Sequence, residues 1–405
     1  MAAPLTVDEA LSRVLTGVIA FGPADCETVS IEAALGRILG TSLTTRDWQP
    51  PFNASAMDGW AVRASDVAAV PARLVIIGES AAGHPFDGSL GAGQAVRIFT
   101  GAPVPAGADA IVIQENARRD DTHVVVTEGT IDPDYIRSRG LDYGPGAPVA
   151  AAGDRLTPRL ITLAAATGAG TVTVRRKPKV AILATGDELV APGTVELGPG
   201  QIRASNHIGI AAMVEATGGL PRILGIARDT RESLDAHIAA AADADILVTI
   251  GGASVGDHDL VAPALQARGM DLDFWKIAMR PGKPLMFGRQ GDQRVIGVPG
   301  NPVSSLVCAR LFLVPLIRAY LGLDPEPHRI TQARVATPLA ANGARAHYMR
   351  AITGRDADGL TVTPVPSQDS SLLTPLAQAD CLLVRPIGAP TCTAGTRVPI
   401  LMLDF

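Results

Sequence analysis

The chain has 405 residues, with 40 acidic and 35 basic side chains, so its formal net charge is −5. This length corresponds to about two to three domains. A slightly acidic chain has no basic excess with which to gain from counterion release, so neither general nucleic-acid binding nor binding to an anionic membrane is expected. Apolar residues make up 47% and charged residues 19% of the chain, a composition that excludes long disordered stretches.

The N-terminal segment has the pattern of a capped amphipathic helix. Thr6 and Glu9 are spaced as a capping box, and apolar residues recur at helical spacing from Val7 to Val18. The segment has no basic n-region, so it is not expected to be a signal peptide. A second amphipathic segment, residues 29–39, predicts another helix that ends at Gly40.

Residues 47–146 have the texture of a small β domain. Short β-branched runs, separated by glycine and proline clusters, lie at 74–77, 95–99, 110–113 and 123–127. Helical spacing returns at 159–166 and stops at Gly168. We therefore expect the β domain to be inserted in a discontinuous helical domain made of residues 1–46 and 147–176.

From residue 177 onward, apolar strands and helices alternate. Strands are predicted at 180–184, 222–227, 246–250, 274–279, 285–287 and 295–298. Helices are predicted at 206–216, from a capping box at Asp229 and Glu232 to 242, at 260–268 and at 303–321. Continuous apolar strands that alternate with helices predict a doubly wound, mainly parallel sheet covered on both faces, assigned to residues 177–323. The class is therefore multidomain α/β plus β.

The remaining segment, residues 324–405, returns to short strands. These are predicted at 329–335, 348–352 and 360–365, and we expect them to form a separate C-terminal β-barrel. The most apolar run of the chain, 306–317, contains Arg310 and Pro315 and is too short to cross a bilayer, so no membrane span is predicted.

The four cysteines show neither C-x-x-C pairing nor histidine partners at zinc-ligand spacing. They are Cys26, Cys308, Cys381 and Cys392. We expect reduced thiols and a cytoplasmic protein.

Glycine-rich and polar segments follow the predicted strands of the α/β region, where ligands bind in doubly wound sheets. They are residues 185–188, 228–229, 251–259, 280–284 and 299–302. The 251–259 loop suits an anion cradle, because glycines let backbone N–H groups approach a ligand closely. An ordinary glycine-rich turn is the alternative interpretation. The loop lacks the Lys-Ser/Thr of a Walker A motif, and no G-x-G-x-x-G or G-x-S-x-G motif supports nicotinamide or serine-hydrolase chemistry.

Five carboxylates should gather at this edge of the sheet: Asp187, Glu188, Asp229, Asp257 and Asp259. Like charges in one cleft repel each other unless a cation or a protonation change relieves them. Hard oxygen ligands beside an anion site favour Mg²⁺ bridging a phosphate or pyrophosphate. Lys276, Arg280 and Lys283 would then hold either a second anion or the far side of the same one. Helix caps and solvated surface charges are the alternative, and the spacing does not say which carboxylate contacts metal.

Two further loops, residues 55–61 and 139–142, place aspartates beside glycines at the two ends of the β domain. By themselves they are typical of turns with structural aspartates. The histidines are scattered, without an i, i+4 pair or a nucleophile partner, so none is assigned a catalytic role.

Taken together, seven segments resemble the molybdopterin molybdenumtransferase family, the molybdenum-inserting enzymes of molybdenum cofactor biosynthesis. They occur in the family's order at 55–61, 99–109, 139–142, 185–189, 251–259, 281–284 and 299–302. The resemblance implies an elongated homodimer of four-domain subunits, with the active site between the α/β domain of one subunit and the inserted domain of the other. Members of the family cleave the phosphoanhydride of adenylylated molybdopterin in a Mg²⁺-dependent step, release AMP and insert molybdenum from molybdate.

The resemblance also implies individual site residues. The implied catalytic residues are Asp58, Asp142, Glu188, Asp229 and Asp259, of which Glu188, Asp229 and Asp259 are the implied metal ligands. The implied substrate-binding residues are Thr100, Asp187, Gly251, Gly252, Ser254, Lys276, Arg280, Lys283, Pro299, Gly300, Asn301, Ser304, Arg350 and Ser370. Within that set, those similar to the family's molybdate-binding residues are Arg280, Lys283, Ser304, Arg350 and Ser370. Arg280 stands where many relatives have lysine, and Trp60 where tyrosine is frequent.

Three alternatives to this function stay open. Gephyrin, which contains a homologous region, also acts as a scaffold for receptor tails. The molybdopterin adenylyltransferase, which is also an expected partner, shares the α/β module but normally lacks the inserted β and C-terminal modules. Nucleotide pyrophosphatase relatives with the same α/β module are the third alternative.

Overall fold

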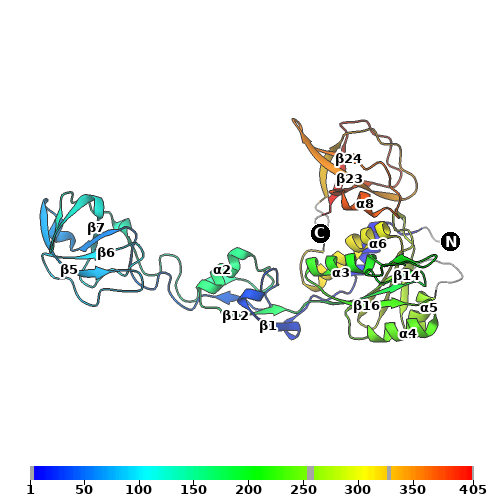
Figure 1. The fold of residues 1–405 in the computed structure, drawn as a ribbon, viewed down its shortest axis with the longest axis horizontal. Helices are drawn as coiled ribbons and strands as arrows, with labels where there is room; N and C mark the ends of the chain where they lie inside the picture. Colours follow the sequence, from blue (N-terminus) through cyan, green and yellow to red (C-terminus); the bar gives the residue numbers. More distant parts are fainter. Residues whose placement is uncertain (1–3, 253–259, 326–329, 404–405) are drawn as a thin grey trace. The chain divides into compact units, whose positions relative to one another are not determined.

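The computed structural model describes residues 4–252, 260–325 and 330–403. Two compact units make up the chain, and Figure 1 shows the elements of each. We call Thr28–Val174 the insert unit, and Met1–Glu27 together with Arg175–Phe405 the main unit.

The insert unit contains a six-stranded sheet with the order β7-β4-β6-β5-β9-β8. Its strands are β4 (Gly59–Val62), β5 (Ala72–Ser80), β6 (Gln94–Ile98), β7 (Ala110–Ile113), β8 (Ala117–Asp120) and β9 (His123–Val126). Trp60, Leu74 and Val124 are buried together on this sheet, because alternate side chains of each strand face the same side. The four predicted β runs of this region are confirmed.

The rest of the insert unit consists of paired short strands and one helix. The strands are β1 (Cys26–Ser30) with β12 (Thr171–Arg175), β2 (Leu43–Thr44) with β11 (Pro148–Ala150), and β3 (Ala54–Ser55) with β10 (Ile136–Arg137). Helix α2 (Pro158–Ala166) is capped by Thr157, whose hydroxyl accepts from the N–H of Leu160, and it confirms the predicted helix.

The second predicted helix, residues 29–39, is wrong. The segment is the end of β1 followed by a single 3₁₀ turn, Ile31–Ala33. Ile31 and Leu39 are buried in a cluster with Val172 and Val174. The apolar residues of this segment are spaced as in an amphipathic helix, but they reach the same hydrophobic core from a backbone that is not helical. Gly36 has φ +75°, a left-handed conformation that interrupts any helix through this segment.

The main unit is built on a six-stranded sheet with the order β16-β13-β17-β21-β20-β18. Its strands are β13 (Lys179–Thr185), β16 (Leu220–Ala227), β17 (Ile246–Ile250), β18 (Asp271–Trp275), β20 (Met286–Gln290) and β21 (Gln293–Val298). The first four strands in the spatial order are parallel, and β20 and β18 are antiparallel to their neighbours. The predicted mainly parallel α/β sheet is therefore confirmed.

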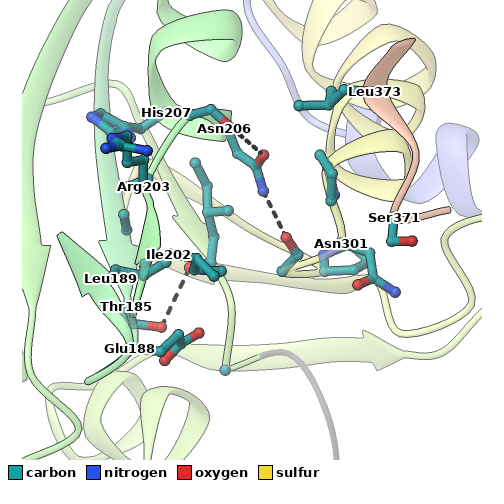
Figure 2. Close-up of a pocket in the computed structure, with 18 of the residues that line it drawn as sticks. Thr185, Glu188, Leu189, Ile202, Arg203, Asn206, His207, Asn301, Ser371 and Leu373 are labelled. Atoms are coloured by element: carbon teal, nitrogen blue, oxygen red, sulfur yellow. Dashed lines mark hydrogen bonds between the residues drawn. The ribbon is translucent and has the colours of Figure 1, made fainter. Parts of the chain in front are cut away.

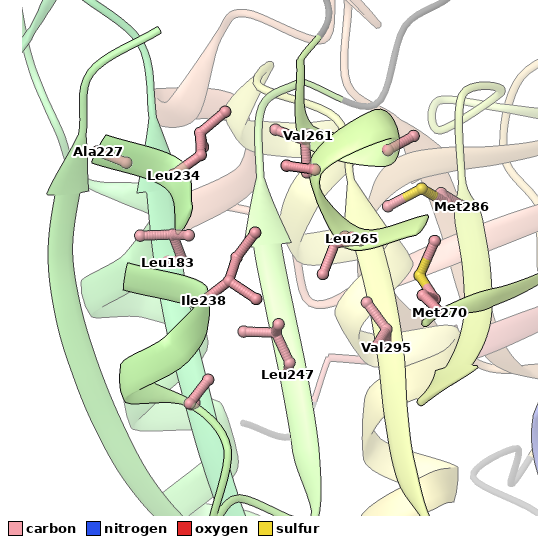
Figure 3. Packing of buried hydrophobic residues seen from close by; sticks show 14 of the residues in the cluster. Leu183, Ala227, Leu234, Ile238, Leu247, Val261, Leu265, Met270, Met286 and Val295 are labelled. Atoms are coloured by element: carbon pink, nitrogen blue, oxygen red, sulfur yellow. The ribbon is translucent and has the colours of Figure 1, made fainter. Parts of the chain in front are cut away.

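Helices cover both faces of this sheet. On one face, Leu234 and Ile238 of α4 (Arg231–Ala240) and Leu265 of α5 (Val261–Ala267) pack on Leu247 and its neighbours (Figure 3). Helices α3 (Asn206–Thr217) and α6 (Pro302–Cys308) lie on the other face (Figure 1). Helix α3 ends one residue beyond the predicted range 206–216, and Gly218, with φ +99°, follows it as the C-cap.

Two helix details differ from the predictions. The N-cap of α4 is Thr230, whose hydroxyl accepts from the N–H of Ser233, so the capping box predicted at Asp229 and Glu232 is wrong. The predicted helix 303–321 is continuous but has three parts: α6, a π-helical turn at Ala309–Leu313, and α7 (Val314–Tyr320). Pro315 has no N–H to donate, and the wider π turn accommodates its ring. The whole helix, Pro302–Tyr320, is apolar and long enough to cross a membrane, but 83% of its most apolar window is buried inside the protein.

The strand predicted at 274–279 is interrupted. Strand β18 ends at Trp275, and Lys276 has φ +96°, which turns the chain away from the sheet. Strand β19 (Met279–Arg280) then pairs with β23 (Ala346–Asp356) of the C-terminal region. A run predicted as one strand therefore serves two sheets, and the break falls at Lys276, its one charged residue.

The C-terminal region is a closed β-barrel, as predicted. Its remaining strands are β22 (Ile330–Val335), β24 (Gly359–Pro364), β25 (Cys381–Arg385) and β26 (Arg397–Met402). Pairing of β23 with both β24 and β25 closes the sheet. The other elements of the main unit are α1 (Val7–Leu15), α8 (Leu373–Ala377), β14 (Leu189–Val190) and β15 (Ile202–Arg203). The capping box predicted at Thr6 and Glu9 is present in α1, which ends three residues before Val18.

Candidate active site

A pocket of about 610 Å³ opens at the carboxyl end of the parallel strands in the main unit (Figure 2). Its walls come from the loop after β13, the start of α3, the loop between β21 and α6, and the barrel segment before α8. They include Thr185, Glu188, Ile202, Asn206, His207, Gly252, Pro299, Gly300, Asn301, Ser371 and Leu373. This is the edge at which the sequence places the ligand-binding loops.

The loops after β13 and β17 approach each other closely. The Thr185 hydroxyl donates to the carbonyl of Ile250 at 3.3 Å. Gly251 has φ +89°, and a Cβ there would lie 2.8 Å from the carbonyl oxygen of Thr185. Gly186 has φ +146°, and a Cβ there would lie 2.5 Å from the Glu188 carboxylate. Glycine at 186 and 251 therefore allows both the close approach of the strand ends and the inward fold of Glu188.

Three of the predicted carboxylates do gather here. The backbone N–H of Asp229 donates to the Asp187 carboxylate at 3.3 Å. Partial burial raises the pKa of Asp229, and the negative charges of Asp187 and Glu188 raise it further. Arg228 donates to the backbone carbonyl of Asp187 at 3.0 Å. Asp257, Asp259 and Ser254 lie outside the described residues.

The loop between β21 and α6 connects α3 to the barrel. Asn206 of α3 donates to the carbonyl of Gly300 at 2.6 Å (Figure 2). Asn301 donates to the Ser370 hydroxyl at 3.1 Å, and the N–H of Val303 donates to the Ser370 carbonyl at 3.1 Å. The pocket is therefore closed on one side by barrel residues that the α/β region itself holds.

Arg350 is 1% exposed and donates to three carbonyls of one barrel loop, those of Ser367, Asp369 and Leu372. This loop carries Ser370, and Ser371, which lines the pocket, follows it. Arg350 thus positions the loop from behind. Ser304 is also buried, on α6.

The predicted cations lie on the turn between β18 and β20. Gly282 has φ +106°, and a Cβ there would lie 2.5 Å from the Sγ of Cys308, so the turn packs tightly on α6. Lys283 is exposed, and its neighbour Pro284 lines the pocket. Lys276 is half-buried and holds the left-handed conformation that begins this turn, with its N–H on the carbonyl of Leu285 at 3.0 Å. Arg280 is exposed and donates to Asn342 of the barrel at 3.0 Å.

In the insert unit, Asp58 and Thr100 are brought together. The Asp58 carboxylate accepts from the N–H of Thr100 at 2.7 Å and from its hydroxyl at 2.8 Å. These two bonds lower the pKa of Asp58, so it is an anion at neutral pH.

The segment 139–142 lies beside the same stretch of the insert unit. Asp142 donates its N–H to the carbonyl of Gln49 at 2.9 Å, and Arg139 donates its N–H to the Asn53 side chain at 2.9 Å. The Arg139 guanidinium stacks on Trp48, whose ring packs against Gly140. The two predicted loops of this unit are therefore organised by one connecting segment, residues 48–58.

Three family profiles match the chain in order. They are the MoeA N-terminal region (domain I and II) over residues 5–168, a probable molybdopterin binding domain over 181–319, and the MoeA C-terminal region (domain IV) over 332–403. The molybdopterin molybdenumtransferase of Nostoc sp. is 38% identical over 80% of this chain and 76% of its own length. That of Bacillus subtilis is 34% identical over 99% of this chain and 94% of its own. The chain belongs to the molybdopterin molybdenumtransferase family.

A solved relative shows the same fold. The molybdopterin biosynthesis MoeA protein from Pyrococcus horikosii superposes with a TM-score of 0.82 and 31% identity over 100% of both chains. The expected family and the predicted combination of α/β, inserted β and barrel parts are therefore confirmed, and the chain is an enzyme of this family.

The family implies Mg²⁺, and the described residues supply part of a site for it. Glu188 and Asp229 offer carboxylate oxygens where neighbouring negative charge already raises the pKa of Asp229, so a cation would relieve repulsion there. Within residues 4–252, 260–325 and 330–403, no group of three His, Cys, Asp or Glu side chains is placed to hold a metal ion. The third implied ligand, Asp259, lies outside those ranges.

The start of α3 is a part of this pocket that sequence reasoning missed. Asn206 and His207 line the pocket, although β15, which precedes them, is not part of the main sheet. The available signal was the asparagine at the first position of a predicted helix, since helix N-termini face ligands in such folds.

Proposed function

We propose that the chain inserts molybdenum from molybdate into adenylylated molybdopterin, cleaves the phosphoanhydride and releases AMP, giving molybdenum cofactor. One observation carries this proposal: the pocket at the carboxyl edge of the molybdopterin-binding region is lined by polar residues that include Glu188, and the negative charges of Asp187 and Glu188 raise the pKa of Asp229 although Arg228 lies 3.9 Å from the Asp187 carboxylate. Such a site suits a ligand that arrives with a metal ion and a phosphoanhydride.

In the main unit, neutral, basic and acidic residues have different proposed roles. Neutral donors and acceptors such as Asn301 and Ser371 suit the pterin. Lys276, Arg280 and Lys283 hold the oxyanion and stabilise negative charge that develops on it. Glu188, Asp229 and Asp259 would hold Mg²⁺, which when bound neutralises charge on the phosphoanhydride oxygens.

The proposal includes a homodimer in which Asp58, Thr100 and Asp142 act at the site, and a molybdopterin adenylyltransferase that supplies the substrate. Family membership supports this assembly, and the ionised state of Asp58 suits a role in placing a cation or water. We also propose that the reaction takes place in the cytoplasm, which agrees with four unpaired cysteines.

The test is an omission experiment with the full chain. Adenylylated molybdopterin, Mg²⁺ and molybdate are supplied together and with each left out in turn, while AMP release and reconstitution of an apo-molybdoenzyme are measured. We expect AMP and reconstitution only with the complete mixture. Release of AMP without molybdate would indicate a pyrophosphatase, and adenylylation of molybdopterin from ATP would indicate an adenylyltransferase.

Asp58→Asn tests the role of Asp58, and Asp87→Asn is its matched control. Asp58 accepts two bonds from Thr100, whereas Asp87 is exposed on the same unit. We expect Asp58→Asn to reduce AMP release at least about 100-fold, because it loses the anionic charge at the site while keeping the side-chain volume. Asp87→Asn should behave as the wild type, and equal activity of both variants would remove Asp58 from the proposed site.

A further inference from the structure

The insert unit carries two exposed aromatic rings. Among the residues that the structure describes, Trp48 and Phe52 are the only exposed Phe, Trp or Tyr side chains, at 42% and 40% of their surface. The other described rings of these types are buried or half-buried. A tryptophan left in water forgoes the large stabilisation that burial of its ring gives, so Trp48 points to a binding partner.

Trp48 differs from Phe52 because a cation lies against its ring. The guanidinium carbon of Arg139 is 5.2 Å from the centroid of the Trp48 ring, and no cation occupies such a position over Phe52 in the described part of the chain. Arg139 is exposed, and within the same residues no carboxylate lies within salt-bridge distance of it. An uncompensated positive charge therefore stands beside an exposed indole.

Hydrogen bonds between the two loops hold this pair in place. The N–H of Arg139 donates to the side chain of Asn53 at 2.9 Å, and the N–H of Gly140 donates to the carbonyl of Pro50 at 2.9 Å. Gly140 has φ +76°, and a Cβ there would collide with the Trp48 ring, so glycine lets the backbone approach the indole. The ring and the cation are therefore placed before any ligand arrives, which lowers the entropic cost of binding.

We propose that Trp48 and Arg139 bind an adenine nucleotide, with the base stacked on the indole and the phosphate held by the guanidinium. Nucleobases stack on aromatic side chains through their π faces, and a guanidinium fork matches two oxygens of a phosphate. A flat base and an anionic phosphate are the two recognisable parts of a nucleotide, and the pair offers one group for each.

The identification of this nucleotide as the AMP part of the substrate rests on the proposed function. In that function AMP leaves a site that includes Asp58 and Asp142. Asp58 lies on the same connecting segment as Trp48, and the N–H of Asp142 donates to the carbonyl of Gln49 at 2.9 Å. The pair therefore belongs to the two loops that carry these aspartates, and it would hold the AMP part of the substrate beside them.

The test separates the base from the phosphate with three probes. Equilibrium dialysis with the full chain measures the affinity for AMP, for adenosine, which lacks the phosphate, and for ribose 5-phosphate, which lacks the base. Trp48→Leu keeps an apolar side chain against Gly140 but removes the π face. It should weaken AMP and adenosine at least about fivefold and leave ribose 5-phosphate within about twofold. Arg139→Gln should weaken AMP and ribose 5-phosphate at least about fivefold and leave adenosine within about twofold.

Matched variants on the same unit control for folding and for general loss of surface groups. Trp48→Phe keeps an aromatic ring and should bind AMP within about threefold of the wild type. Phe52→Leu removes the other exposed ring, and Arg118→Gln removes another exposed cation, so neither should change the three affinities. Thermal unfolding checks that each variant is folded. A folded Trp48→Leu chain that binds AMP as tightly as the wild type overturns the proposal, and so does a wild-type chain that does not bind AMP.

Tryptophan fluorescence gives a second measure of stacking. Trp60 is buried and Trp275 half-buried, so Trp48 is the described tryptophan that a dissolved nucleotide can reach most easily. AMP and adenosine should quench its emission, because a stacked base contacts the indole, and ribose 5-phosphate should not. The quenching should be lost in Trp48→Phe although that variant still binds AMP. Quenching that persists in Trp48→Phe would place the base elsewhere and overturn the proposal.

The nucleotide pair and the proposed function can fail separately. AMP release from adenylylated molybdopterin is therefore assayed in parallel with binding. AMP binding that depends on Trp48 and Arg139, without any AMP release, rejects the proposed function alone. AMP release by a chain whose AMP affinity neither Trp48→Leu nor Arg139→Gln changes rejects the nucleotide pair alone. Sedimentation of the same variants tests the other occupant of an exposed ring: loss of self-association in Trp48→Leu with unchanged AMP affinity would assign Trp48 to a subunit contact and overturn the proposal.

Discussion

Two carboxylates at opposite edges of the main sheet have opposite environments. Asp245, just before β17, accepts two bonds from Arg176 at 2.7 and 2.8 Å and one from the N–H of Lys179 at 2.7 Å. Asp229, just after β16, has no cation within salt-bridge distance among the described residues, and Asp187 and Glu188 help to raise its pKa. Charge at the amino edge is compensated and holds the fold together. The charge of Asp229 at the carboxyl edge is left for a ligand, although Asp187 beside it lies 3.9 Å from Arg228.

The largest expected difference between the two edges is in activity. Asp229→Asn should lower AMP release at least about 100-fold, because it would remove a carboxylate ligand of the proposed Mg²⁺. Asp245→Asn should leave the rate per folded molecule within about twofold, since Asp245 lies at the other end of the strands. Single-turnover AMP release, normalised to the folded fraction of each variant, measures both. Equal losses in the two variants would mean that the edges are not functionally distinct.

Stability should show the reverse order. Asp245→Asn should lower the free energy of unfolding by about 2 kcal/mol. This value lies between those for an exposed and a fully buried ion pair, because the side chains of Arg176 and Asp245 are 31% and 18% exposed. Asp243 is the control: it pairs with Lys179 and Arg222 but is 57% exposed, so Asp243→Asn should cost less than about 1 kcal/mol. Urea unfolding followed by circular dichroism measures both. A loss at Asp243 as large as that at Asp245 would contradict the compensated-edge interpretation.

The strands of both units were predictable because their periodicity depends on burial. Val180 through Ala184 are all buried in a strand covered on both faces, which gives a continuous apolar run. In the insert unit, β9 alternates between half-buried and buried positions, as one covered face requires. Patterns of this kind are local, so the sequence alone carries them.

What failed depends on contacts that lie far away in the sequence. Residues 29–39 have helical spacing, but Ile31 and Leu39 pack in one core with Val172 and Val174, which lie more than a hundred residues later in the sequence. The run 274–279 is apolar apart from Lys276, and at that residue the chain leaves one sheet for the barrel. Local spacing does not encode which of two cores a residue joins.

The sequence predicted which residues gather at the candidate site better than it predicted how their side chains are arranged there. The strand-end rule correctly placed Asp187, Glu188 and Asp229 together, because all parallel strands end at one edge. It could not show that Thr230 would cap α4 and leave Asp229 to the site, nor that Arg350 would hold a barrel loop from behind. Both depend on side-chain geometry that spacing leaves open.

The smallest expected effect is the change in unfolding free energy caused by Asp229→Asn, which should be opposite in sign to the change caused by Asp245→Asn. A carboxyl whose pKa is raised on folding contributes stability below its unfolded pKa and loses that contribution as the pH rises through the folded pKa. At pH 7 without divalent metal, Asp229→Asn should therefore stabilise the protein slightly, by no more than about 0.5 kcal/mol because Asp229 is largely exposed, and the gain should shrink as the pH falls toward 4. Added Mg²⁺ should reverse the order by stabilising only the wild type, since the ion binds the folded carboxylates. Urea unfolding with EDTA and with Mg²⁺ gives both values, and an Asp229→Asn variant that is destabilised in EDTA would show that Asp229, like Asp245, serves the fold.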